Sequence, residues 1–210
     1  MATHLIPDPY PIPSERTEAT TSAGNSTFVA IAQRIESVEE ARAVVADRRR
    51  ERPDATHHCY AFAVGHGASV THGSSDDGEP SGTAGRPILA VVAGSGLGDV
   101  IVVVTRYFGG TKLGTGGLVR AYTDAAKAVL EACPRRLKIA RLRLVGHATY
   151  PLYDLVHRIA VAAGADVLGA DFNADVRVTV EVDADKVLAL QAAVAEATAG
   201  VVSFAAIDDL

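Results

Sequence analysis

The sequence predicts an α+β protein built from two domains. Strand-like and helix-like segments follow one another along the whole chain, and in the second half their order is βαββαβ. The charge balance also changes: residues 1–143 hold 17 basic and 15 acidic side chains, whereas residues 144–210 hold 3 and 10. Because such a shift in composition is typical of a domain junction, we predict an arm over residues 1–24, a first domain over 25–135 and a second over 136–210.

The overall composition is that of a globular protein. Of the 210 residues, 48% are hydrophobic and 21% are charged, and the formal net charge is −5; these values exclude disorder along the whole chain. No apolar run reaches the ~20 residues of a membrane helix, and the opening MATHLIPDPYPIP has no secretion-signal pattern. Cys59 and Cys133 are too few for a disulfide framework, which fits a reducing compartment. We therefore expect a cytoplasmic protein without membrane contact.

The chain opens with prolines at alternate positions, namely Pro7, Pro9, Pro11 and Pro13. Proline fixes φ and lacks an N–H group, so residues 1–24 are predicted to be extended and unpacked. Residues 26–35 (STFVAIAQRI) are predicted to form a strand. A helix follows, because Ser37 can cap its start, Glu40 completes a capping box, and Pro53 ends the periodic run.

The middle of the first domain alternates strands and helices. His58–Val64 is predicted to be a strand, and residues 72–86 are predicted to be a polar, glycine-rich loop. For Pro87–Val92 we favour a short apolar helix over a strand. Val100–Thr105 is β-branched almost throughout, which predicts a central strand. A glycine-dense loop over residues 109–117 then leads into a helix predicted for Leu118–Cys133.

The second domain has a regular order of elements. The predicted strands are residues 137–144, 166–170, 176–182 and 201–206, and the predicted helices are residues 153–163 and 184–198. Four antiparallel strands with two helices on one face in this order make a ferredoxin-like fold. Many unrelated functions use this fold, so the fold alone does not identify a function.

The strongest functional signal is the run VVTRYFGGTKLGTGGLVRAY at residues 103–122. Its candidate phosphate-binding or nucleic-acid-binding residues are Arg106, Gly109, Gly110, Thr111, Lys112, Gly114, Gly116, Gly117 and Arg120. Glycine amides can approach a ligand closely, and a helix start adds partial positive charge. The spacing matches neither a Walker A loop nor G-x-G-x-x-G, so the run predicts a less specific anion pocket suited to phosphate. Alternatively, the glycines serve tight turns and packing, and the arginines pair with carboxylates.

A second signal is the acidic loop SDDGEPSGTAGRPIL at residues 75–89. Its oxygen-bearing residues are Asp76, Asp77, Glu79, Ser81 and Thr83. Such oxygens suit Mg²⁺, the one cofactor candidate, although the spacing is not that of an EF-hand and Asp-Gly is common in turns. We favour a role in which these carboxylates brace Arg86, Arg106 or Arg120 and join the two loops in one site.

Other chemically active residues give weaker signals. In THHCY, neighbours on a strand point to opposite faces, so we interpret Cys59 as a buried, inert thiol and the adjacent histidines as structural. No Ser-His-Asp or HExxH pattern occurs. The basic residues Arg48, Arg49, Arg50 and Arg52 complement a helix dipole and are expected to be solvated.

Two long motifs in order, SSDDGEPSGTAGRPIL and VVTRYFGGTKLGTGGLVRAY, with ATHHCYAF upstream, resemble the IMPACT/YigZ family over residues 25–133. The second half resembles the small C-terminal domain of bacterial members. The resemblance implies a βαβ first domain similar to domain IV of elongation factor G and a second domain similar to its domain V. Eukaryotic relatives regulate translation initiation, so a general link to translation is implied. Thr27 and His58 depart from the family pattern, and Thr27 weakens any basic patch at that edge.

The sequence therefore predicts a non-catalytic, translation-associated regulator that binds RNA, the ribosome or a translation factor. Arg106, Lys112 and Arg120 would meet phosphate, and the acidic loop would orient the arginines. The alternative is a Mg²⁺-dependent enzyme or a binding protein for a small phosphorylated ligand. A third reading is a protein adaptor in which the loops are scaffold only. The oligomeric state is left open.

Overall fold

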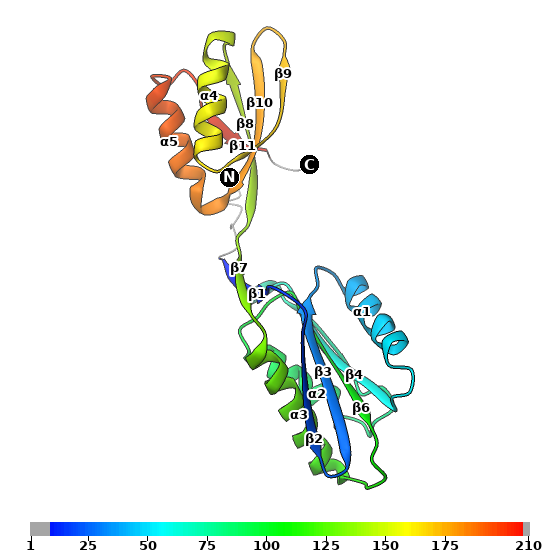
Figure 1. Ribbon diagram of the computed structural model, residues 1–210. Coiled ribbons are helices and arrows are strands. Elements are labelled where there is room, and N and C mark those ends of the chain that lie inside the picture. The colour runs from blue at the N-terminus through cyan, green and yellow to red at the C-terminus, as the bar shows by residue number, and fades with distance from the viewer. Residues whose placement is uncertain (1–8, 208–210) are drawn as a thin grey trace. The chain divides into compact units, whose positions relative to one another are not determined.

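The computed structural model describes residues 9–207, which form two compact units of mixed α and β structure (Figure 1). Tyr10–Lys138 form the first unit, and the described residues from Ile139 onward belong to the second. The division thus lies three residues beyond the boundary expected from the sequence. No helix within residues 9–207 combines the length and apolar character that crossing a membrane requires.

The first unit is built on a five-stranded antiparallel sheet. Its order is β2-β3-β6-β4-β5. The strands are β2 (Thr17–Ala23), β3 (Ser26–Arg34), β6 (Val100–Tyr107), β4 (His57–Val64) and β5 (Thr71–Ser75). β6 is central, as predicted, because its β-branched side chains are buried on both faces of the sheet.

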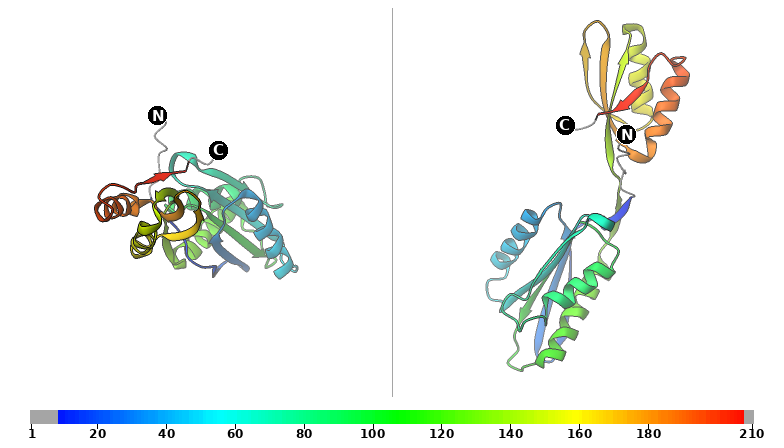
Figure 2. Two further views of the ribbon diagram at one scale, coloured as in Figure 1. Left: turned by 90° about the horizontal axis from the view of Figure 1, so that it is seen from above. Right: turned by 180° about the vertical axis from the view of Figure 1, so that it is seen from behind.

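Helices cover both faces of this sheet (Figures 1 and 2). α1 (Val38–Glu51) lies on one face, and α2 (Gly85–Gly94) and α3 (Gly114–Ala132) lie on the other. Alternate residues of β6 serve the two cores: Val102 packs in the α2–α3 core, whereas Val103 packs in the core beneath α1. The predicted helix at Pro87–Val92 is confirmed.

The prediction that the N-terminal arm is unpacked is wrong in part. β1 (Tyr10–Pro13) pairs with β7 (Arg135–Lys138), and β2 forms one edge of the main sheet. β2 was not predicted because its sequence, TEATTSA, is polar. An edge strand with an exposed face needs few apolar residues. β5 is likewise a polar edge strand inside the predicted loop at 72–86. Residues 1–8 of the arm lie outside the described residues.

Arg48 also departs from the prediction of a solvated cluster. Its side chain is buried on the sheet-facing side of α1, where Nε donates to Thr105 Oγ1 at 3.0 Å. Nη1 lies 3.0 Å from Glu18 and 3.1 Å from Glu51. The physical reason is the helical spacing from Ala41 and Val45, which places residue 48 on the buried face.

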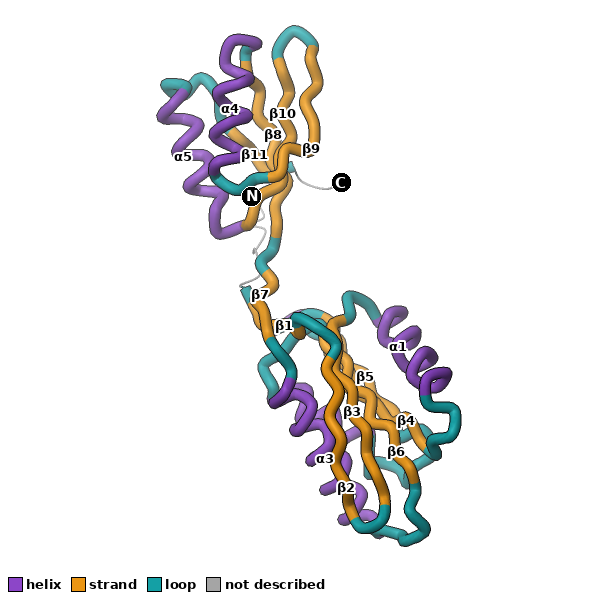
Figure 3. The backbone as a smooth tube through the Cα atoms, in the orientation of Figure 1, coloured by secondary structure: helices purple, strands orange, loops and turns teal. Residues whose placement is uncertain are grey.

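The second unit has the predicted βαββαβ order (Figure 3). Its elements are β8 (Arg141–Ala148), α4 (Tyr150–Ala162), β9 (Asp166–Phe172), β10 (Val176–Asp183), α5 (Val187–Ala197) and β11 (Phe204–Ala206). The antiparallel sheet has the order β11-β8-β10-β9. α4 and α5 cover one face and enclose a core that includes Val156, Val180 and Leu190.

Candidate functional site

Arg106, near the end of β6, is buried and paired rather than open to solvent. Nη1 donates to Glu79 Oε1 at 2.6 Å, and Nη2 donates to Ser26 Oγ at 3.2 Å. The side chains of Arg106 and Glu79 are 6% and 3% exposed. The prediction that Arg106 meets a bound phosphate is therefore wrong, because a buried carboxylate already occupies it. The pair instead joins the acidic loop to β6.

The buried polar network continues to α3. Tyr122 OH donates to Glu79 Oε1 at 2.7 Å, and the Cys59 thiol lies 3.3 Å from Tyr122 OH and 2.9 Å from Asp76 O. Burial raises the pKa of Cys59 to about 12. Cys59 is therefore a neutral, buried thiol, in agreement with its interpretation as a structural residue.

Asp76 closes the acidic loop onto the start of α2. Its Oδ2 accepts from Gly82 N at 2.8 Å, and its Oδ1 accepts from Ala84 N at 2.9 Å and Gly85 N at 2.8 Å. Burial raises the pKa of Asp76, but these amide hydrogen bonds outweigh it and hold the pKa below its usual value. Asp76 thus accepts hydrogen bonds from backbone amides, and within the described part of the chain it forms no ion pair with an arginine.

Asp77 ties the same loop to α1 and β4. Its carboxylate pairs with Arg49 and accepts from His58 N at 2.6 Å. Its carbonyl oxygen lies 2.8 Å from His57 Nδ1. The predicted bracing of arginines thus involves Arg49 as well, a partner that sequence spacing did not indicate. Of the remaining loop residues, Thr83 donates to Pro80 O at 2.6 Å, and Ser81 is exposed.

The geometry of the acidic loop does not favour Mg²⁺. Asp76, Asp77 and Glu79 each accept from protein donors, as described above. Within residues 9–207, no three side chains of His, Cys, Asp or Glu gather in an arrangement suited to a metal ion.

The exposed basic residues lie around the start of α3. Thr111, Lys112 and Arg120 are exposed, and neither Lys112 nor Arg120 forms an ion pair with any described residue. α3 begins at Gly114, so Gly114, Gly116 and Gly117 form its first turn instead of the predicted loop. No side chain caps this helix at its N-cap residue, Leu113. The first amides of α3 therefore lack the side-chain cap that commonly satisfies such groups.

Four of the five glycines have a structural reason. A Cβ on Gly109 would lie 1.7 Å from Asn25 O, and one on Gly117 would lie 3.0 Å from Leu113 Cβ. Gly110 and Gly114 have φ values of +85° and +71°, which favour glycine. Gly116 differs: its φ is not positive, and a Cβ there would meet no atom within 4 Å. The packing explanation therefore leaves Gly116 unexplained.

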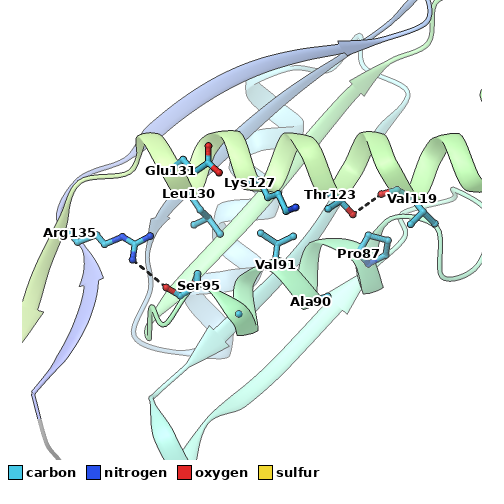
Figure 4. A pocket seen from close by; sticks show the side chains of 11 residues that line it. Pro87, Ala90, Val91, Ser95, Val119, Thr123, Lys127, Leu130, Glu131 and Arg135 are labelled. Carbon is cyan, nitrogen blue, oxygen red and sulfur yellow. Dashed lines mark hydrogen bonds between the residues drawn. The ribbon is translucent and has the colours of Figure 1, made fainter.

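Two hollows adjoin α3. A hollow of about 190 Å³ lies against β2 and includes Gly117, Arg120 and Asp124 in its lining. A larger, mainly apolar groove of about 650 Å³ lies between α2 and α3, lined in part by Val91 and Leu130 (Figure 4). None of the candidate residues lines the larger groove, which arises from the packing of two helices and has no local sequence signal.

Sequence reasoning also passed over Phe108. The residue is 46% exposed, although it lies only two positions after the buried Arg106 in the run RYFGG. The available signal was an aromatic residue at the entrance to a glycine-rich loop.

These features define a two-domain α+β protein with a glycine-rich, basic surface at a helix start. The first domain matches the model of the Impact N-terminal domain over residues 24–130, and the second matches a domain of unknown function, DUF1949, over residues 147–201. The chain belongs to the IMPACT family. An IMPACT family member from Haemophilus influenzae is 34% identical over 95% of both chains. IMPACT family member YigZ from Escherichia coli is 36% identical over 88% of this chain and 91% of its own.

The chain also matches solved structures. A crystal structure described as that of a hypothetical protein covers 98% of this chain and 100% of its own, with 33% identity and a TM-score of 0.76. Yih1, described as a two-domain translational regulator, aligns with 63% of this chain and 52% of its own at 28% identity. The TM-score of that alignment is 0.36, too low to support an argument from shared structure.

Proposed function

We propose that this chain is a non-catalytic, translation-associated protein that binds RNA phosphates at the start of α3. The observation that carries the proposal is the exposure of Lys112 and Arg120 without a carboxylate partner among the described residues. Lys112 precedes a helix start with no side-chain cap, and Arg120 lies on the second turn of the same helix. Phosphate suits such a place, because it accepts from free amides and is attracted by the positive end of the helix dipole.

Gly116 adds independent support. Glycine within a helix costs about 0.5–1 kcal/mol relative to alanine, and nothing in the fold requires it at this position. Close approach of a ligand to the backbone is one use of glycine that would explain it. The exposed hydroxyl of Thr111, which accepts from Asn25 Nδ2 at 3.3 Å, lies in the same loop and can donate to a phosphate oxygen.

The positions of Cys59 and His58, a neighbouring thiol and imidazole, support a non-catalytic role. Cys59 is buried with a pKa of about 12, so it holds almost no thiolate at neutral pH. Burial also lowers the pKa of His58, whose Nδ1 lies 3.2 Å from Thr105 Oγ1. Both residues are occupied within the core of the first unit.

The link to translation rests on the family resemblance. The expected likeness to domains IV and V of elongation factor G stays a prediction, as does a place in the cytoplasm, where ribosomes reside. The ribosome is accordingly the proposed source of the RNA. The small hollow beside Arg120 is below the ~300 Å³ typical of a ligand pocket, which favours a surface contact over a small phosphorylated ligand.

An RNA-binding assay with charge reversals tests the proposal. Lys112→Glu and Arg120→Glu should each weaken binding of a single-stranded oligonucleotide of about 12 residues severalfold. Arg42→Glu is the matched control, since Arg42 is 73% exposed on α1, which covers the other face of the sheet.

If the wild-type protein binds no RNA, or if all three variants bind equally well, the proposal fails. Retention on ribosomal particles after nuclease treatment that removes accessible RNA would instead favour the protein-adaptor reading.

A further inference from the structure

Phe108 is an exposed aromatic ring supported from beneath by a buried cation. The guanidinium carbon of Arg106 lies 5.3 Å from the centroid of the Phe108 ring and 5.6 Å from that of Phe28. Both distances are within the range of cation–π contacts. One side of the Phe108 ring therefore rests on a defined partner, while 46% of the residue remains accessible to solvent.

The support is itself fixed in place. Arg106 is anchored by Glu79 at 2.6 Å and by Ser26 at 3.2 Å, both of them buried. Gly109, the residue after Phe108, fits so tightly against Asn25 that any Cβ on Gly109 would collide with the carbonyl oxygen of Asn25. The contact with Arg106 and the tight fit of Gly109 thus fix Phe108 in place. Binding of a flat ligand to the ring would therefore cost little conformational entropy.

The surroundings of Phe108 indicate what would cover it. Lys112 and Thr111 follow in the same short loop, and both are exposed. Aromatic rings that stand beside cations are the usual means of holding unpaired nucleotides: the ring stacks on a base while the cations meet its phosphates. Bases in a duplex are already stacked on their neighbours and are not open to such contact.

We infer that Phe108 stacks on an unpaired base and makes this surface selective for single-stranded RNA. The inference rests on the proposed function and adds the substrate class to it. The basic residues would supply sequence-independent affinity, and the ring would distinguish unpaired from paired RNA.

A structural role for Phe108 is the competing explanation, because the ring also lies against the guanidinium of the buried Arg106. Substitutions separate the two roles. Phe108→Leu keeps an apolar cover but removes the aromatic face, whereas Phe108→Tyr keeps both. Because the residue is nearly half exposed, these variants should fold, and urea unfolding of each confirms that the fold is retained.

Binding is measured with a single-stranded oligouridine, the same backbone without bases, and a duplex of equal length. We expect Phe108→Leu to bind the oligouridine at least about fivefold more weakly than wild type, the loss expected for one stacked base. Phe108→Tyr should bind it as wild type does. Neither variant should change binding to the base-free backbone or the duplex.

A fluorescent variant gives a readout that a merely structural role would not produce. The chain contains no tryptophan, so Phe108→Trp introduces a single indole. We expect oligouridine to quench its emission and the base-free backbone to leave it unchanged. Equal emission with both ligands would overturn the inference.

The outcomes distinguish the two proposals. If Lys112→Glu weakens binding but Phe108→Leu does not, the stacking inference is wrong and the proposed function stands. If Phe108→Leu weakens binding to all three ligands equally, the ring acts through structure and the inference is again wrong. If wild type binds none of the ligands, both proposals fail.

Discussion

Glu79 and Arg106 form a buried ion pair, with Glu79 Oε1 2.6 Å from Arg106 Nη1. The carboxylate also accepts from Tyr122 OH at 2.7 Å, so a single residue joins the acidic loop to β6 and to α3. The pair fixes the base of the proposed RNA-binding loop without facing solvent. Glu79 lies in the acidic loop and Arg106 in the run at residues 103–122, the two strongest motifs of the sequence.

Replacing one partner of this pair should strongly destabilise the protein. Glu79→Gln leaves the Arg106 charge buried without a counter-ion, and such losses cost about 3 kcal/mol or more. Urea unfolding measures the change in the free energy of unfolding. The double variant Glu79→Gln with Arg106→Gln should lose less than the sum of the two single variants, because it leaves no unpaired charge. Additive losses would show that the two side chains are not coupled.

Acid should remove a contribution from the pair of Arg16 and Glu51. The hydrogen bond from Arg16 lowers the pKa of Glu51 from 4.5 to about 2. Because the folded state has the lower pKa, the contribution is complete above about pH 4.5 and is lost as the pH falls through about 2.

The size of this acid effect should be modest. The Glu51 side chain is 38% exposed, and solvent screening limits such a pair to roughly 1 kcal/mol or less. Glu51→Gln should flatten this part of the stability–pH curve, whereas Glu39→Gln, on the exposed face of the same helix, should leave it unchanged. An identical acid limb in wild type and Glu51→Gln would contradict the assignment.

Cys59 should react with thiol reagents only when the protein opens. It is wholly buried and its pKa is about 12, so at about pH 8 both access and thiolate content are low. Mass spectrometry after iodoacetamide treatment should show slow modification at Cys59 under native conditions and rapid modification in urea. Rapid native labelling at this residue would contradict the interpretation of Cys59 as a buried, inert thiol.

Gly116→Ala should separate stability from binding. Because a Cβ there meets no atom within 4 Å, alanine should raise the free energy of unfolding by about 0.5–1 kcal/mol. The same methyl group should weaken RNA binding if a phosphate approaches the backbone at this turn. Thermal or urea unfolding and the RNA-binding assay measure the two effects, and unchanged RNA affinity would remove Gly116 from the proposed site.

Strong local patterns predicted much of the fold. The β-branched run of β6 identified the central strand, and Ser37 identified the start of α1, where its Oγ accepts from Glu40 N at 3.1 Å. The polar edge strands β2 and β5 were missed because their positions depend on pairing with distant strands. Such long-range pairing leaves little mark on the local sequence.

The sequence predicted which residues gather at the site, but not which of them are exposed to solvent. The sequence indicated the glycines, the basic residues and the carboxylates, yet it could not show that Arg106 faces Glu79 inside the core. Gly114 likewise became the first residue of a helix, because its positive φ lets the chain turn into α3 directly after the loop. Burial and pairing of this kind depend on tertiary contacts between segments far apart in the chain.

The most direct test of the account is the salt dependence of RNA binding for wild type and Lys112→Glu between about 50 and 200 mM NaCl. Each phosphate contact releases counter-ions, so the slope of log affinity against log salt reports the number of contacts. We predict a clearly negative slope for wild type that becomes shallower by about 1 in Lys112→Glu. Equal slopes for the two proteins, or a wild-type affinity that does not change with salt, would contradict phosphate binding at the start of α3.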